Sequence, residues 1–193
     1  KLLGFNWFNE EIILARAWFS ANFYQTKLDN TRLLKVNVDG SGFKSLFKKR
    51  HFKDLPWLPP FQAGIVDYLP DDDDHVLVEI DISNYRFPSI VKLNVKKNSI
   101  SEIRRPKTDV VSWETDRSGK ARIGIKYNDD KKKQSSIIFY DLNRKQWQTI
   151  WEFENFSEDA ISVLGFGEDP NKVWYSKYLD GRKAIFSADL SKK

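Results

Sequence analysis

The chain has 193 residues, of which 40% are apolar and 15% aromatic, so it is long enough to bury a globular core. It has no cysteine, which excludes disulfides, thiol catalysis and cysteine-bound zinc. The net charge of +5 is a mild basic excess, and the basic runs 48–50 and 131–133 fall at expected turns without interleaved aromatic residues. This pattern favours solubility over nucleic-acid binding, and no apolar run is long enough to span a membrane.

Short runs rich in β-branched and aromatic residues, separated by polar turns, predict an all-β protein. The first group of antiparallel strands is expected at residues 4–8, 12–19, 32–38 and 43–47, with a polar connection over 22–30. A loop rich in proline and aromatic residues follows at 51–60, and then the strand pattern starts again.

Two more groups of four strands and one group of three complete the chain. They are expected at 64–68, 75–81, 88–95 and 99–104, then at 109–114, 121–127, 136–142 and 146–153, and finally at 161–166, 173–178 and 184–190.

The third strands of the four groups align without gaps and carry an Asn or Asp at one shared position. These residues are Asn37, Asn94, Asp141 and Asp189. A spacing of roughly 50 residues with four strands per repeat is typical of β-propeller blades, because a single blade cannot bury both of its faces. A β-sandwich is the alternative fold.

We therefore expect a single partial propeller domain over 1–193, as a fragment of a larger propeller. Its blades are expected at about 4–47, 61–104, 109–153 and 160–190, the last one incomplete. The absence of methionine from the whole chain also suggests a piece of a longer product. A fragment with unpaired edge strands is expected either to dimerise edge to edge or to have further blades in its native context.

The segments DYLPDDDDHVLVEI, PSIVKLNVKKNSISEI, VVSWETDRSGKARIGI and DGRKAIFSADL resemble the N-terminal propeller of the prolyl oligopeptidase family of serine peptidases. The most specific part is LPDDDDHVLV at 69–78, and the nearest group is that of bacterial dipeptidyl aminopeptidases and acylaminoacyl peptidases. The resemblance extends from about residue 5 to residue 190, and its other parts are shared with TolB-like propellers.

The resemblance implies a propeller that covers an α/β-hydrolase domain and admits only short peptides to its active site. This chain has no G-x-S-x-G segment, so the hydrolase part is not in it. We predict a non-catalytic gating domain whose partners are that hydrolase domain and short peptides, in the periplasm or cytoplasm of a bacterium. The alternative is a stand-alone TolB-like propeller that binds a protein partner.

No catalytic, cofactor-binding or metal-binding residue is predicted in the chain. Ser41 lies in a Gly-Ser-Gly hairpin turn, and neither His51 nor His75 is expected beside a nucleophile. The acidic run 71–74 with His75 offers ligands for a hard cation, but a solvated turn is the favoured interpretation because the spacing lacks the alternation of a calcium loop.

Two further features have both a functional and a structural interpretation. Dipeptidyl peptidases of the resembled family hold the free amino terminus of a substrate with a Glu pair, which Glu10 and Glu11 match, although an ordinary turn is favoured. The tryptophans expected to pack between blades are Trp7, Trp113 and Trp174. Trp57, in the proline-rich loop, is expected to be exposed and to contact a neighbouring domain.

Overall fold

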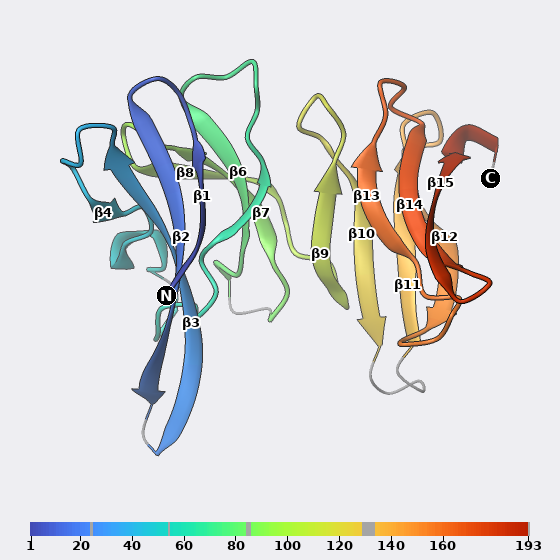
Figure 1. Ribbon diagram of the computed structural model, residues 1–193, viewed down its shortest axis with the longest axis horizontal. Coiled ribbons are helices and arrows are strands. Elements are labelled where there is room, and N and C mark those ends of the chain that lie inside the picture. Colours follow the sequence, from blue (N-terminus) through green and yellow to red (C-terminus); the bar gives the residue numbers. More distant parts are fainter. Residues whose placement is uncertain (24, 54, 84–85, 129–133, 193) are drawn as a thin grey trace. The chain divides into compact units, whose positions relative to one another are not determined.

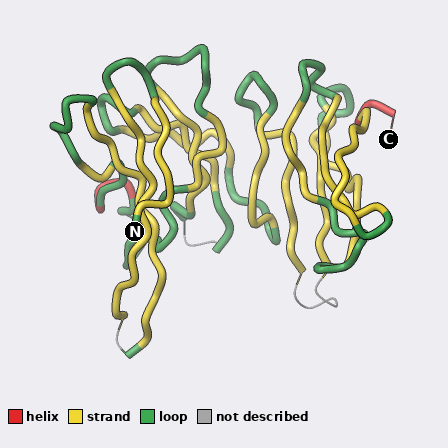
Figure 2. The backbone as a smooth tube through the Cα atoms, viewed as in Figure 1, coloured by secondary structure: helices red, strands yellow, loops and turns green. Residues whose placement is uncertain are grey.

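The computed structural model describes every residue except 24, 54, 84–85, 129–133 and 193, and it confirms an all-β chain (Figure 1). The described residues form four antiparallel sheets in which strands pair in chain order, as in propeller blades. Figure 2 shows how little helix there is beside these strands. No helix in the described part of the chain has the length and apolarity that crossing a membrane requires.

The chain divides into two compact units, Lys1–Pro106 and Lys107–Lys193, each with two sheets. Sheet 1 contains β1 (Leu2–Trp7), β2 (Ile12–Phe23), β3 (Thr26–Asn37) and β4 (Lys44–Ser45), and is followed by the 3-10 turn η1 (Lys49–His51). Sheet 2 contains β5 (Gly64–Asp67), β6 (His75–Ile80), β7 (Ser89–Asn94) and β8 (Ser99–Arg104).

The second unit repeats this arrangement with one strand fewer. Sheet 3 contains β9 (Val110–Thr115), β10 (Ala121–Asn128), β11 (Gln134–Asp141) and β12 (Gln146–Glu154). Sheet 4 contains β13 (Ser162–Phe166), β14 (Lys172–Leu179) and β15 (Arg182–Asp189), followed by the 3-10 turn η2 (Leu190–Lys192). Sheet 4 is therefore the incomplete blade that the sequence predicts.

The predicted polar connection over 22–30 is wrong. The strands β2 and β3 continue through it as one long hairpin. This hairpin, which we call the arm, extends past the other strands of its sheet (Figure 1). In the arm Ser20 pairs with Asp29, and Asn22 with Lys27. Its ladder is made of backbone hydrogen bonds with largely exposed side chains, so the apolar alternation that marks a half-buried strand is missing.

Each unit has one buried core, and both of its sheets contribute apolar side chains to this core. In the first unit Leu14 and Leu33 of sheet 1 belong to the same buried cluster as Val78 and Leu93 of sheet 2. In the second unit Ile123, Ile137 and Phe139 of sheet 3 cluster with Val173 and Leu190. The shared core explains why neighbouring sheets form one compact unit, since a lone blade leaves its faces exposed.

The Asn or Asp predicted at a shared position is the last residue of the third strand in every sheet. Its side chain stabilises the turn that follows. Asn94 Oδ1 accepts from the Lys97 N–H at 2.6 Å, Asp141 Oδ1 from the Asn143 N–H at 2.8 Å, and Asp189 Oδ1 from the Ser191 N–H at 3.0 Å. Asn37 instead donates to Ser41 Oγ at 3.0 Å.

A second fourfold repeat lies in the turns between first and second strands. In each turn an Asn or Asp side chain accepts from the backbone N–H two residues later, which is the Asx-turn pattern. The four acceptors are Asn9, Asp72, Asp116 and Asp169, with donors at Glu11, Asp74, Ser118 and Asn171.

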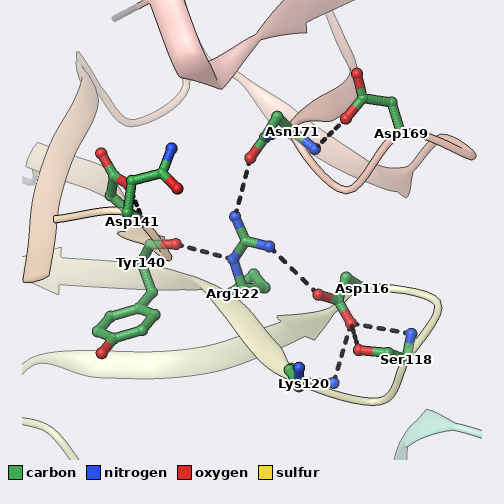
Figure 3. Close-up of polar contacts among 9 residues, drawn as sticks. Asp116, Ser118, Lys120, Arg122, Tyr140, Asp141, Asp169 and Asn171 are labelled. Atoms are coloured by element: carbon green, nitrogen blue, oxygen red, sulfur yellow. Dashed lines mark hydrogen bonds and ion pairs between the residues drawn. The ribbon is translucent and has the colours of Figure 1, made fainter. Parts of the chain in front are cut away.

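One buried charge links the two sheets of the second unit (Figure 3). Arg122 is the second residue of β10, and its side chain is fully buried. Its guanidinium donates to Asp116 Oδ2 at 3.4 Å, to the Tyr140 carbonyl at 2.8 Å and to Asn171 Oδ1 at 3.3 Å in the turn before β14. In the other three sheets, the second residue of the second strand is apolar. Arg122 is therefore the one charged residue at this position.

We predict that Asp116→Ala destabilises the protein by about 3–5 kcal/mol, because it leaves the buried Arg122 guanidinium without its carboxylate. The free energy of unfolding in urea measures this. The matched control is Asn9→Ala, which removes the same kind of turn acceptor in the first unit, leaves the hydrogen bonds of Arg122 in place, and should cost about 1 kcal/mol. Equal losses in the two variants would show that the ion pair adds nothing.

Candidate interaction surface

The proline-rich loop after η1 is fixed to the base of the arm by polar contacts. The Pro60 carbonyl accepts from the Thr31 N–H at 2.9 Å and from Arg32 Nη1 at 3.0 Å. The Gln62 N–H donates to Thr31 Oγ1 at 3.0 Å, and its buried side chain donates to the Pro59 carbonyl at 2.8 Å. Prolines cannot donate to a strand ladder, so side chains and flanking backbone groups hold this loop instead.

The Arg32 guanidinium contacts both the loop, through a hydrogen bond, and the arm, through an aromatic ring. The guanidinium lies 5.1 Å from the centre of the Phe19 ring on β2 while it donates to Pro60. Burial lowers the pKa of Arg32, as expected for a charge that is partly removed from water. The loop is therefore held in a defined position, although it carries several exposed apolar side chains.

A mostly apolar hollow of about 320 Å³ lies where the loop meets the arm. Its apolar lining comes from Trp57, Leu58 and Pro60 of the loop and from Ala21 and Leu28 of the arm, and Asn22 and Asn30 complete it. The exposed fraction is 53% for Trp57, as predicted for this residue, and 45% for Leu58. Contiguous exposed apolar side chains on a fixed backbone are typical of contact sites for other proteins.

Edge strand β1 adds a second exposed apolar stripe to the same unit. Leu3, Phe5 and Trp7 alternate along β1 and are each about half exposed or more. Trp7 was predicted to pack between blades, but in this chain its side chain is 59% exposed on the edge strand of sheet 1. Trp174 is also partly exposed, with the Lys172 ammonium 5.3 Å from its ring.

Trp113 is the one tryptophan of the predicted three that is buried. It is 1% exposed, and its ring lies 5.6 Å from the ring of Trp147 on the same sheet. Gly124 lies beneath it, where an added Cβ would come within 3.1 Å of the Trp113 ring. Trp113 thus packs over its own sheet.

Of the residues considered for a catalytic triad, Ser41 and His51 lie in turns and His75 begins strand β6. Ser41 Oγ donates to Asp39 Oδ1 at 2.7 Å inside its hairpin turn. His51 accepts from the Lys48 N–H at Nδ1, and its Nε2 lies 3.1 Å from the Asn98 carbonyl, so both ring nitrogens are used in holding η1. Burial lowers the pKa of His51, which favours this neutral form.

The four aspartates of the acidic run 71–74 lie in a turn, where ion-paired side chains alternate with exposed ones. Asp72 accepts from His75 Nδ1 at 2.8 Å and pairs with Lys92 at 2.7 Å, while Asp74 pairs with Lys96 at 2.8 Å. Asp71 and Asp73 are exposed. Within the described ranges, no group of three or more His, Cys, Asp or Glu side chains is arranged to hold a metal ion.

Glu10 and Glu11 lie in the turn between β1 and β2, where the Asn9 side chain accepts from the backbone of Glu11 and Ile12. They border a hollow of about 420 Å³ that also contains Lys35 and Lys96. Burial and the nearby Lys44 and Lys96 lower the pKa of Lys35. The hollow therefore already contains charges of both signs, unlike a site built only for an ammonium group.

No family model matches the chain, and no curated protein matches it. Several solved structures are similar to it, among them a TolB and an oligogalacturonate lyase. TolB from Acinetobacter baumannii is 14% identical, with a TM-score of 0.49, and the match covers 90% of this chain and 39% of that one. An oligogalacturonate lyase in complex with manganese is 12% identical, with a TM-score of 0.52 over 91% of this chain and 47% of that one.

Both of these structures are β-propellers, and the chain spans less than half of the length of either. At these identities the similarity shows the fold alone. The four antiparallel sheets and the similarity to the lyase structure support the propeller prediction, while the comparisons do not extend to a peptidase.

We predict that stability falls as the pH drops below about 4, because Asp72 is held ionised in the folded state. Lys92 and then His75 keep the pKa of Asp72 well below its usual range. The unfolded chain therefore takes up this proton first, and the contribution of Asp72 is complete above its unfolded pKa. Urea unfolding from pH 6 to pH 2.5 should show a shallower decline for Asp72→Asn than for the control Asp71→Asn in the same turn.

We also predict that Trp57→Ala changes the free energy of unfolding by less than about 1 kcal/mol, because the ring is largely in water. The control is Phe52→Ala in the same loop, where the ring is 2% exposed and its removal should cost about 3–5 kcal/mol. Urea denaturation of both variants provides the comparison. A large loss in Trp57→Ala would show that Trp57 belongs to the core and not to a contact surface.

Proposed function

We propose that the chain is a non-catalytic propeller segment of a serine peptidase resembling the prolyl oligopeptidase family, and that it restricts access to a hydrolase domain of the same protein. The observation that carries the proposal is the fixed apolar surface around Trp57. Such a surface suits permanent contact with a second domain, because leaving it in water has a free-energy cost.

The proposal assigns no chemistry to this chain. Its Ser41 and His51 side chains are engaged within turns, and a nucleophile of this peptidase class needs a strand-to-helix elbow. The assignment to a peptidase depends on the resemblance of the segment 69–78. In that arrangement the hydrolase domain supplies the nucleophile and oxyanion hole, and the propeller limits the size of substrates.

The alternative is a propeller without a hydrolase domain that binds a protein partner, as in the TolB-like hypothesis. The same apolar surface would then receive a separate protein. The two hypotheses differ in whether the gene product that contains this chain carries a reactive serine.

The experiment is to isolate the native gene product with an antibody against this chain, and to treat it with a fluorophosphonate probe for activated serines. We expect a product much longer than 193 residues that is labelled at the serine of a G-x-S-x-G segment. Heat-denatured product is the control, since labelling must depend on the folded site. An unlabelled product without such a segment would overturn the peptidase proposal in favour of partner binding.

A further inference from the structure

The second unit, Lys107–Lys193, contains a groove between its two sheets. It has a volume of about 340 Å³ and is formed by the last residues of β12, the connection 155–161 and β14. Its lining residues are Trp151, Glu152, Phe153, Glu154, Ser157, Asp159, Ile161, Tyr175 and Lys177. Aromatic and acidic residues alternate along β12 and so leave opposite faces of this edge strand, and both kinds border the groove.

The aromatic base is continuous across the two sheets. The Trp151 ring on β12 lies 4.8 Å from the Tyr175 ring on β14, and Tyr175 stacks on Phe186 of β15 at 5.6 Å. Trp151 and Phe153 also pack partly against the core of the unit. The rings are therefore fixed in place, and their faces can accept a cation or the stem of a long basic side chain.

The charge of this region is opposite to that of the chain as a whole. Residues 146–171 contain six carboxylates and no Lys or Arg, so this segment carries −6. Because the chain carries +5 in total, the other residues together carry +11. A concentration of negative charge on a basic protein attracts a basic partner and disfavours acidic ones.

The carboxylates at the groove rim are available to such a partner. Glu152 and Glu154 are exposed, and neither forms an ion pair with any residue that the structure describes. Lys177 borders the groove, but its ammonium lies over the Phe186 ring at 5.5 Å. Glu168, in the same acidic segment, lies outside the groove and faces Arg117 at 3.9 Å.

Besides the aromatic rings and the carboxylates, the backbone of β12 is a third feature that suits peptide binding. β12 is at the edge of sheet 3, and no other strand in the described part of the chain pairs with its outer side. An edge strand offers backbone N–H and C=O groups to an extended peptide, and side-chain pockets beside the edge then select its sequence.

We propose that this groove binds an extended, Lys- or Arg-containing segment of a partner protein. The basic side chain lies over Trp151 and Tyr175 and its charge reaches the carboxylates that border the groove, while the peptide backbone runs along β12. The site is separate from the apolar surface of the first unit and does not depend on the peptidase proposal. It recognises an internal side chain, so it needs no free amino terminus.

The test measures binding of short fluorescent peptides to the 193-residue chain by anisotropy. Each peptide is acetylated and amidated, and the series compares Arg, Lys and the neutral Gln at one position. We expect the Arg and Lys peptides to bind and the Gln peptide to bind at least about tenfold more weakly. The double variant Glu152→Gln/Glu154→Gln should lose about tenfold in affinity for the Arg peptide and show a weaker dependence on salt.

The matched control is Glu158→Gln/Glu168→Gln, which removes the same charge from the same acidic segment but outside the groove lining. Its affinity should change by less than about twofold. Equal losses in the two double variants, or equal binding of the Arg and Gln peptides, would overturn the proposal. A third variant replaces Lys131, Lys132 and Lys133, which lie outside the described residues, with Ser. Peptide binding that appears only in this variant would show that the chain's own lysines occupy the groove, and would also overturn it.

Discussion

A small antiparallel sheet has two faces and cannot cover either by itself, and this constraint organises the whole molecule. In each unit two sheets share one buried cluster, with Leu33 and Val78 in the first and Ile137 and Val173 in the second. The second unit adds Arg122 to this contact. Burial of a charge is unfavourable unless it is paired, so the arginine is stable only while carboxylate, carbonyl and amide oxygens of both sheets surround it.

The strand pattern was predictable because buried strands carry a clear period. In the segment 75–81, Val76, Val78 and Ile80 recur at every second position, and the repeated Asn or Asp at 37, 94, 141 and 189 indicated one register for four sheets. The arm was missed because its residues pair through the backbone while their side chains stay in water, which leaves no hydrophobic period to detect. Arg122 was missed because a lone arginine in a strand is normally a surface residue.

The contact surfaces were only partly predictable, and for a different reason. Trp57 was expected to be exposed because prolines surround it and keep its segment out of a sheet. The groove at Trp151 depends on a ring from another sheet, Tyr175, which no local pattern places beside it. A search of the sequence for long stretches without basic residues finds 146–171 and would have drawn attention to it.

The Asx turns have a consequence for the order in which the molecule folds. Each acceptor, such as Asn9 or Asp169, lies two residues from its donor, so the turn needs no distant part of the chain to close. The hairpins they join are contacts of low sequence separation, which form fast. The slow step is then the docking of one finished sheet on the next, when residues such as Arg122 and Asn171 first meet across 49 positions of sequence. A propeller built this way can gain or lose a blade during evolution while the folding of each hairpin stays the same.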